Sequence, residues 1–365
     1  MKHKLLYFLF NQKINQRNID RFYLNEFKKK KIKIKVINFF NQKKIINNNF
    51  QYLNFKDNKI KIIKDAISEK PNYYVDITNM TLIEILFQRI LFFLNSRRVK
   101  IDIGLIPIQN TRYNLLKYLL KKKNYLKFFL KFIDRIFYKI FLKVFLPKIK
   151  KSFVSGKMGS NIAQKRKDEI IVKAHNLDYD IYLKEKNKNN VKAKHILYID
   201  QAFEDSIDLK TDEMKLNKIS VFNKKMKIFF NNFKNKKIII AGSDRRNNKK
   251  NIFNQKTFYN QTCKLVKNSN LVVGHNSTAL QYAILFSKPI LLLSSDELKS
   301  IPVIQENILN LKKILKCNYL ELEHPNIKIN YKINKKLYSK YIKDYIKEKI
   351  DNRNFFKIFV NNVFK

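Results

Sequence analysis

The segment LVVGHNSTALQYAILFSKPILLL, residues 271–293, constrains the fold more than any other part of the chain. An apolar run ends at Gly274, four polar residues follow, and a helix-period segment then leads through Lys288–Pro289 into a second apolar run. This order is typical of a strand, a turn, a helix and a strand. Ser277 or Thr278 is placed to cap the helix, so that its first free N–H groups point beyond the strand end. A phosphate is the usual occupant of such a position, so we expect a phosphorylated ligand here, such as a nucleotide.

Strands and helices alternate through both halves of the chain, which at 365 residues and 45% apolar content can bury two cores. This alternation predicts an α/β fold with parallel sheets. The polar stretch 184–194 is the expected linker, which divides an N-terminal domain (1–190) from a C-terminal domain (191–365). The expected strands are Leu5–Phe10, Ile32–Phe39, Tyr73–Ile77, Val99–Leu105, His195–Phe203 and Ile238–Ala241, with others ending before Gly156, before His175, at Gly274 and at Ser294. The expected helices are Asn15–Lys29, Thr81–Leu94, Asp212–Asn232, Thr257–Asn268 and much of the last ~30 residues.

Two Rossmann-like domains facing each other across a cleft follow from this pattern. In open α/β sheets the ligand lies beyond the carboxyl ends of the strands, so the polar residues that follow the strands should gather in the cleft.

The formal net charge is +48, and lysines are spread along the whole chain. Such a surface attracts anionic partners, namely phospholipid, nucleic acid or sugar nucleotide. A nucleic acid is not the expected partner, because no single basic module with aromatic platforms stands out. The two cysteines have no metal-binding spacing and suit a reducing cytosol. No uncharged stretch of ~20 apolar residues occurs, so we expect no transmembrane helix.

A basic amphipathic helix is expected near residues 124–146. Its cations recur every four residues, and most positions between them are apolar. One interpretation is a helix packed on its own domain with its lysine stems extended along the apolar surface. The other is a helix that lies in an anionic membrane surface, for which the wide apolar arc is suited.

Several pieces of the chain, from about Val154 to Leu298, resemble bacterial GT-B-type glycosyltransferases of capsule and surface-polysaccharide biosynthesis. The matching pieces are AHNLDYDIYL, YIDQAF, IIIAGSDRR, NKKNIF, KLVKNSNLVVGHNSTALQYAILFSKPILLL and SSDEL. The resemblance implies transfer of a sugar from a nucleotide-sugar donor to a surface-polysaccharide or lipid-linked glycan acceptor, with no metal or other cofactor. We expect such an enzyme to be cytoplasmic and peripheral at the anionic inner-membrane surface, where the basic helix near residues 124–146 would dock it beside its acceptor. Gly242–Ser243–Asp244 departs from the family's His-Pro-Arg-like turn and leaves its histidine contact without a counterpart.

The expected donor site follows the strands of the second half. The guanidinium of Arg245 can pair with two phosphate oxygens. His275 is expected on the diphosphate or the sugar, the alternative being a structural histidine bonded to a loop. Glu297 is expected to accept ribose or sugar hydroxyls, the alternative being a solvated acid that caps the next helix. The donor-binding residues are therefore predicted to be Arg245, His275, Asn276, Ser277, Thr278 and Glu297.

The catalytic base is expected from the opposing domain, because glycosyl transfer requires deprotonation of the acceptor hydroxyl. The candidates are His175, Asp178 and Asp180, which follow the strand that begins at Ile170. For the two aspartates the alternative is turn and cap chemistry. The spacing of Asp178 and Asp180 is not taken as a metal site.

Two other functions fit the same fold. A sugar-nucleotide epimerase would need more carboxylates around the sugar and no acceptor. A non-catalytic carbohydrate- or nucleotide-binding protein would rely on its charge. Turnover of a nucleotide sugar without acceptor distinguishes the first from a transferase.

Overall fold

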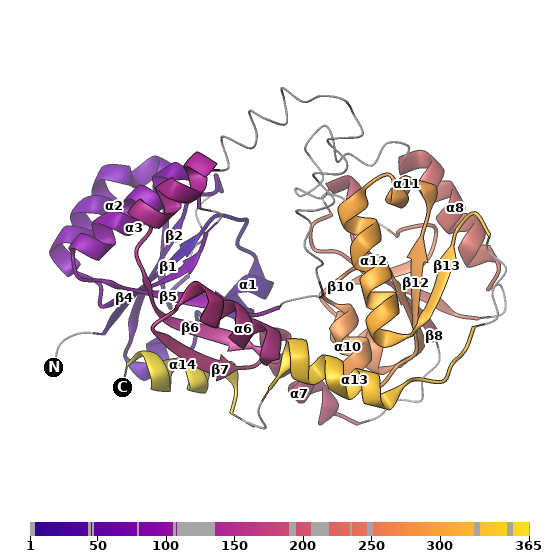
Figure 1. Cartoon of the computed structure of the whole chain (residues 1–365). Coiled ribbons are helices and arrows are strands. Elements are labelled where there is room, and N and C mark those ends of the chain that lie inside the picture. The colour runs from indigo at the N-terminus through magenta and orange to yellow at the C-terminus, as the bar shows by residue number, and fades with distance from the viewer. Residues whose placement is uncertain are drawn as a thin grey trace. The chain divides into compact units, whose positions relative to one another are not determined.

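The computed structural model describes residues 4–364, apart from 43–44, 46, 79, 105–106, 108–135, 190–194, 206–218, 234–235, 247–250, 325–328 and 349–352. The chain forms two compact units of α/β type (Figure 1). Gly104 and Pro107 are grouped with the second unit, the main boundary between the units falls after Leu177, and the chain returns to the first unit at Lys347. Each unit is described by itself below.

Unit 1 contains a seven-stranded sheet in the order β3-β2-β1-β4-β5-β6-β7. All its strand pairs are parallel, and this order places the first and fourth strands side by side, as in a Rossmann sheet. The strands are β1 (Leu5–Phe10), β2 (Lys33–Asn38), β3 (Gln51–Asn54), β4 (Tyr73–Ile77), β5 (Arg97–Asp102), β6 (Ile149–Ser155) and β7 (Ile170–Ala174). The helices include α1 (Gln16–Arg21), α2 (Phe55–Glu69), α3 (Leu82–Phe93), α6 (Gly156–Arg166) and the C-terminal α14 (Phe355–Val363).

The central strand β1 explains how both faces of this sheet are covered. All six of its side chains are buried, and they alternate between two apolar clusters. Leu6, Phe8 and Phe10 belong to the cluster that includes α14, whereas Leu5, Tyr7 and Leu9 belong to the cluster that includes α2 and α3. A strand that is buried on both faces needs a continuous apolar sequence. The sequence LLYFLF therefore indicates a central parallel strand.

Unit 2 contains a six-stranded parallel sheet in the order β10-β9-β8-β11-β12-β13. This is the Rossmann order 3-2-1-4-5-6 when the strands are numbered within the unit. The strands are β8 (His195–Ile199), β9 (Ile238–Gly242), β10 (Lys256–Tyr259), β11 (Ser269–Gly274), β12 (Ile290–Ser294) and β13 (Asn318–Glu321). The helices include α7 (Leu177–Lys186), α8 (Ile219–Asn231), α9 (Thr262–Lys267), α10 (Leu280–Leu285), α11 (Asp296–Lys299), α12 (Pro302–Leu315) and α13 (Lys335–Tyr341).

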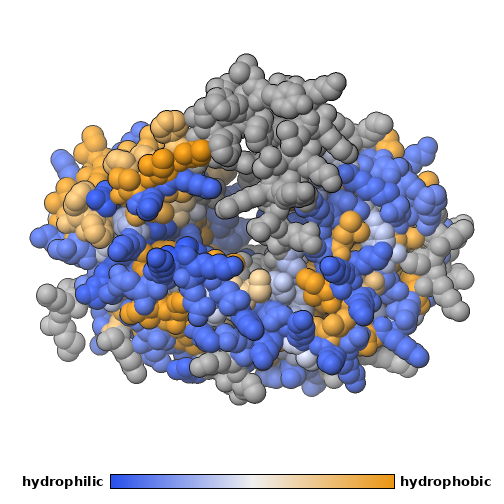
Figure 2. All heavy atoms as spheres, in the orientation of Figure 1, coloured by the Kyte–Doolittle hydropathy of each residue, from blue (hydrophilic) through white to orange (hydrophobic). Residues whose placement is uncertain are grey.

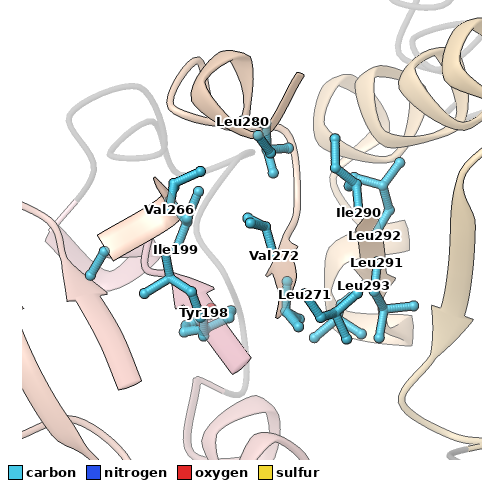
Figure 3. Close-up of a cluster of buried hydrophobic side chains, with 14 of the residues drawn as sticks. Tyr198, Ile199, Val266, Leu271, Val272, Leu280, Ile290, Leu291, Leu292 and Leu293 are labelled. Carbon is cyan, nitrogen blue, oxygen red and sulfur yellow. The ribbon is translucent and has the colours of Figure 1, made fainter. Parts of the chain in front are cut away.

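The core of unit 2 is one apolar cluster that includes its three central strands. Figure 3 shows the side chains of Tyr198 and Ile199 from β8, Val272 from β11 and Leu291 from β12 in neighbouring positions, with Leu280 of α10 above them. These strands fix the carboxyl edge of the sheet, where the polar residues follow.

The prediction of two Rossmann-like domains is confirmed by the two sheets. The bounds predicted for β1 and β4 are those observed. The prediction of one helix over Thr257–Asn268 is wrong at its start, because Lys256–Tyr259 pairs with β9 as an edge strand and only Thr262–Lys267 is helical. Thr257, Phe258 and Tyr259 are residues that favour strands, and they are the signal that was missed.

Other differences are smaller. The observed boundary at Leu177 precedes the expected linker, and α7 extends to Lys186 into that stretch. The last residues are helical as expected, but α14 returns to unit 1 after α13 and a short π-helix, Ile342–Ile346, in unit 2. Residues 124–135 of the expected basic helix lie outside the described residues, and residues 136–145 are helical. No helix in the described residues combines the length and hydropathy needed to cross a bilayer.

Candidate functional site

The candidate site is the carboxyl edge of the unit 2 sheet at its topological switch point, between β8 and β11. Sequential strands turn outward in opposite directions from this pair, so their carboxyl ends leave a crevice in which Rossmann domains bind ligands. Asp200 and Gln201 follow β8, and His275 and Asn276 follow β11. The structure therefore brings together residues that lie far apart in sequence.

Gln201 and Asn276 join the two sides of the switch point. The Gln201 Nε2 donates to Asn276 Oδ1 at 2.8 Å, and the Asn276 backbone N–H donates to Gln201 Oε1 at 3.0 Å. These paired hydrogen bonds fix the path of the turn after β11. Both side chains are half-buried, so Asn276, a predicted donor-binding residue, lies at the surface of the site while also holding it in shape.

Asp200 fixes the neighbouring turn after β9. Its carboxylate accepts two hydrogen bonds from Arg246, at 2.7 and 2.9 Å, and others from the backbone N–H groups of Ala202 and Ser243. Arg246 also contacts Glu204. Burial opposes the charge on Arg246, but Asp200 outweighs that effect and raises its pKa. Asp200 is therefore committed to structure and is not available to a ligand.

Arg245, the predicted phosphate ligand, precedes this paired arginine and is exposed. Its backbone N–H donates to Ser243 Oγ at 3.3 Å, which belongs to the turn after β9. The two successive arginines thus differ in exposure: Arg246 is half-buried and paired with Asp200, whereas Arg245 is exposed.

His275 lies below the surface of the site, with no exposed area. Its Nδ1–H donates to the Leu293 carbonyl at 2.8 Å, and its Nε2 accepts from the Tyr198 hydroxyl at 3.0 Å. The rings of Phe203 and Phe222 lie against it. Burial lowers the pKa of His275 to about 4, despite the opposing hydrogen bond to Leu293, so the ring is neutral at neutral pH. In this position it supports the turn and has no free nitrogen for a diphosphate.

Ser277 and Thr278 form the turn that leads into α10, and both are half-buried. The predicted capping role needs correction: the residue that precedes α10 is Ala279, and its side chain makes no cap hydrogen bond. Ser277 Oγ instead accepts from the Ala279 N–H at 3.2 Å. Because α10 has only six residues, its dipole adds little. The backbone N–H groups of Ser277 and Thr278 have no hydrogen-bond partner among the described residues.

Glu297 follows β12 at the start of α11 and is buried. Its Oε1 pairs with Lys225 Nζ at 2.7 Å, and the same ammonium pairs with Glu323 at 2.6 Å. Burial alone would raise the pKa of Glu297, but the hydrogen bonds from Lys225, Ser295 and the backbone, together with the charge of Lys225, outweigh burial and lower that pKa. Glu297 is thus an ionised member of an ion-pair cluster that joins α8 to the ends of β12 and β13.

The three candidate bases are divided by the boundary after Leu177. His175 lies in unit 1, whereas Asp178 and Asp180 lie in the first turn of α7 and are assigned to unit 2. All three are buried, and the His175 nitrogens contact the backbone carbonyls of Asn176 and Arg353. A general base must reach the proton that it removes, and no exposed carboxylate or imidazole edge is found at these three positions.

Unit 1 has a polar cluster at the carboxyl edge of its own sheet, which was not predicted from the sequence. The Asp76 carboxylate accepts from Thr78 Oγ1 at 2.7 Å and from Arg98 Nη2 at 2.6 Å. Burial of Asp76 opposes its charge, but Lys100 and Arg98 outweigh the burial and lower its pKa. Nearby on α3, Glu84 is fully buried and accepts from the Thr81 N–H. The strand end Asp76–Ile77–Thr78 was the available signal for this cluster.

No group of three or more metal-ligating side chains is found within the described parts of the chain.

The sequence matches no protein-family model and no curated protein sequence. Among solved structures, the chain is similar to a UDP-GlcNAc 2-epimerase from Methanocaldococcus jannaschii crystallised with UDP-GlcNAc and UDP (14% identity, TM-score 0.48, 93% of this chain and 98% of that chain). It is also similar to a variant of the wall teichoic acid polymerase TagF (10% identity, TM-score 0.46, 94% and 80%). A third similar structure is the glycotransferase of kitacinnamycin (8% identity, TM-score 0.42, 89% and 88%). The similarity concerns the fold, and the structures include both of the enzyme classes considered from the sequence.

Proposed function

We propose that this chain is a glycosyltransferase that moves a sugar from a nucleotide-sugar donor to a surface-polysaccharide or lipid-linked glycan acceptor. The observation that carries the proposal is the turn at Ser277 and Thr278. It lies at the switch point of a Rossmann-ordered sheet, and its backbone N–H groups have no partner among the described residues. Backbone N–H groups at such a turn bind phosphate oxygens.

The charge of the surrounding residues supports a diphosphate ligand. Arg245 is an exposed cation on the adjacent turn, and the chain carries a net charge of +48. In the transfer, an acceptor hydroxyl oxygen forms a bond to the anomeric carbon, and the bond from that carbon to the diphosphate breaks. The nucleoside diphosphate leaves with the electron pair, the hydroxyl proton passes to water, and N–H groups with a guanidinium stabilise the charge that the diphosphate gains.

The pairing of the acidic residues favours transfer over epimerisation. An epimerase needs carboxylates free to act around the sugar ring. At the carboxyl edge of the unit 2 sheet, Asp200 is paired with Arg246, and Glu297 and Glu323 are paired with Lys225. These acids are thereby occupied in holding the turns.

A matched pair of variants tests the phosphate-binding turn. Thr278→Pro removes one backbone N–H group, whereas Thr278→Ala removes the hydroxyl and keeps that N–H. We expect UDP or CDP, titrated by calorimetry, to bind the alanine variant like the parent chain and the proline variant at least about tenfold more weakly. Circular dichroism establishes that both variants are folded. Equal affinity of the two variants would remove the turn from the site.

A second pair tests the cation. Arg245→Gln is expected to weaken nucleotide binding about tenfold, because a charge-assisted hydrogen bond is lost. Lys264→Gln removes another exposed charge, from α9, and serves as the control. If both substitutions weaken nucleotide binding equally, the effect comes from net charge and not from a contact of Arg245.

Catalysis is tested with a panel of nucleotide sugars, with and without glycan acceptors, by NMR of the products. Sugar transfer that requires an acceptor supports the proposal. Conversion of the nucleotide sugar in the absence of acceptor identifies an epimerase instead. Binding without either reaction across the panel indicates a binding protein.

A further inference from the structure

Helix α3 of unit 1 has apolar residues on its exposed side as well as on its buried side, where Ile85, Phe87 and Leu91 lie. Glu84 and Gln88 are fully buried, whereas Leu82 and Phe93 are 59% and 70% exposed. A helix on the surface of a water-soluble domain turns its apolar stripe inward and its polar side chains outward. The exposed side of α3 therefore has the composition of a face that is meant to be covered.

The apolar residues extend beyond α3 to two other helical segments of the same unit. Together they make a surface that we call the apolar face of unit 1. Its exposed members are Ile60 and Ile67 of α2, Leu82, Ile83, Leu86, Phe92 and Phe93 of α3, and Ile136, Phe137, Tyr138, Ile140, Val144 and Phe145 of the helical residues 136–145. Figure 2 shows apolar residues gathered where Figure 1 draws α2 and α3.

The helical residues 136–145 belong to this face by direct contact. The Tyr138 hydroxyl donates to the Met80 carbonyl, just before α3, at 2.6 Å. None of the ten side chains from Ile136 to Phe145 is buried. The sequence left open whether this region packs on its own domain or lies in a membrane. Eight of these ten residues are exposed and Phe141 and Leu142 are half-buried, which favours the membrane interpretation.

Cations border the apolar face. Lys59, Lys61 and Lys64 are exposed on α2 beside Ile60 and Ile67. Lys139 and Lys143 are exposed among the apolar residues of the third segment. This combination of exposed aromatic and aliphatic side chains with lysine and arginine is the one that binds an anionic lipid surface.

We propose that the apolar face of unit 1 binds the surface of a phospholipid bilayer that contains anionic lipids. Leu86 and Phe93 would enter the boundary between headgroups and acyl chains, and the lysines would pair with lipid phosphates. The Arg89 guanidinium, which lies 5.1 and 4.9 Å from the rings of Phe92 and Phe93, would reach the same level. A second copy of the chain fits the face less well, because self-association would bring like charges together.

Membrane binding through this face does not depend on the proposed sugar transfer. It would hold unit 1 at the surface where a lipid-linked acceptor is found, but it is measurable without any substrate.

The absence of tryptophan from the chain allows a direct test. Phe93→Trp places a single reporter on the apolar face, and Leu309→Trp places one at an exposed apolar position of α12 in unit 2. We expect vesicles of phosphatidylcholine with about 30% phosphatidylglycerol to shift the emission of the first variant to shorter wavelength. Brominated acyl chains should quench that emission. Neither effect is expected for the Leu309→Trp control, and an unchanged Phe93→Trp spectrum would overturn the proposal.

A sedimentation assay separates insertion from attraction by net charge. The pair Leu86→Ser with Phe93→Ser leaves the charge unchanged, as does the control pair Ile228→Ser with Leu309→Ser in unit 2. At about 0.5 M salt, where long-range attraction is screened, the first pair should lower vesicle partitioning about tenfold or more and the control pair should not. Equal partitioning of the two pairs would refute insertion.

Analytical ultracentrifugation tests the competing occupant. The parent chain could be a dimer that the pair Leu86→Ser with Phe93→Ser dissociates. If so, and if the parent chain also fails to bind vesicles, the apolar face is covered by a second copy and the proposal is wrong. Circular dichroism melting checks that the pair is folded. If it is not, the Phe93→Trp fluorescence still decides.

Discussion

Acidification from pH 7 to pH 5 should destabilise unit 2 by about 2 kcal/mol through His275 alone. The ring has no exposed area, and burial lowers its pKa from 6.5 to about 4. In the unfolded chain the imidazole takes up a proton as the pH falls below 6.5, whereas the folded chain resists protonation until about pH 4. The stabilisation is therefore complete above pH 6.5 and is lost as the pH falls towards 4. When the pH has fallen below both pKa values, the full difference between 6.5 and about 4 corresponds to a loss of about 3 kcal/mol of unfolding free energy.

Urea unfolding of the full chain at several pH values provides the measurement. A Leu309→Trp reporter in unit 2 supplies the signal, because the chain has no tryptophan of its own. His275→Asn in the same background keeps an amide donor for the Leu293 carbonyl but cannot titrate. The stability difference between the parent and this variant should narrow by about 2 kcal/mol between pH 7 and pH 5.

If the parent and variant curves stay parallel through this range, His275 is not buried as a neutral ring, and its bonds to Tyr198 and Leu293 are absent in solution. His324→Asn, at an exposed histidine of the same unit, controls for the replacement of histidine by asparagine as such.

Three further experiments have expected outcomes. Asp76→Asn leaves the buried guanidinium of Arg98 without its carboxylate, so it should destabilise unit 1 by about 3–5 kcal/mol, as measured by denaturant titration. A loss of stability below about 1 kcal/mol would contradict the pairing of Asp76 with Arg98. Gly242→Ala places a methyl group 2.4 Å from the Tyr259 ring and should lower the melting temperature, with partial recovery when Tyr259→Ala is added. Burial raises the pKa of the Cys263 thiol, so a disulfide reagent should label it only after denaturation, and rapid labelling of the native chain would show that it is accessible.

The strands at the centre of each sheet were the easiest elements to predict. β1 and β4 were predicted with the bounds they have, because a parallel strand buried on both faces reads as an uninterrupted apolar run. The edge strand β10 was missed because it has only four residues and buries little. The return of α14 to unit 1 was also missed, since an amphipathic pattern shows that a helix will pack but not on which sheet.

The residues of the candidate site were predictable in position but not in orientation. Parallel strands place their carboxyl ends on one edge, so Asp200, Asn276 and Glu297 could be assigned there from the sequence. Which of two neighbouring arginines faces Asp200 depends on the turn after β9, and no local pattern distinguishes Arg245 from Arg246 for that purpose. His275 turns inward because Tyr198, 77 residues earlier in the chain, provides its hydrogen-bond partner. Such contacts arise from tertiary packing and have no signature in either segment alone.

The carboxyl edge of the unit 2 sheet shows how a strongly basic chain can make a specific anion site. Its buried acids Asp200 and Glu297 are neutralised by Arg246 and Lys225 and hold the turns in place. The groups that remain for a ligand are amides, hydroxyls and backbone N–H groups, with Arg245 exposed beside them. Because its acids are neutralised, a site of this kind does not repel a phosphate, and its hydrogen-bond donors orient the phosphate. Its affinity for a nucleoside diphosphate should therefore fall less steeply with salt than attraction caused by the net charge of the chain, because short hydrogen bonds are screened less than long-range Coulomb forces.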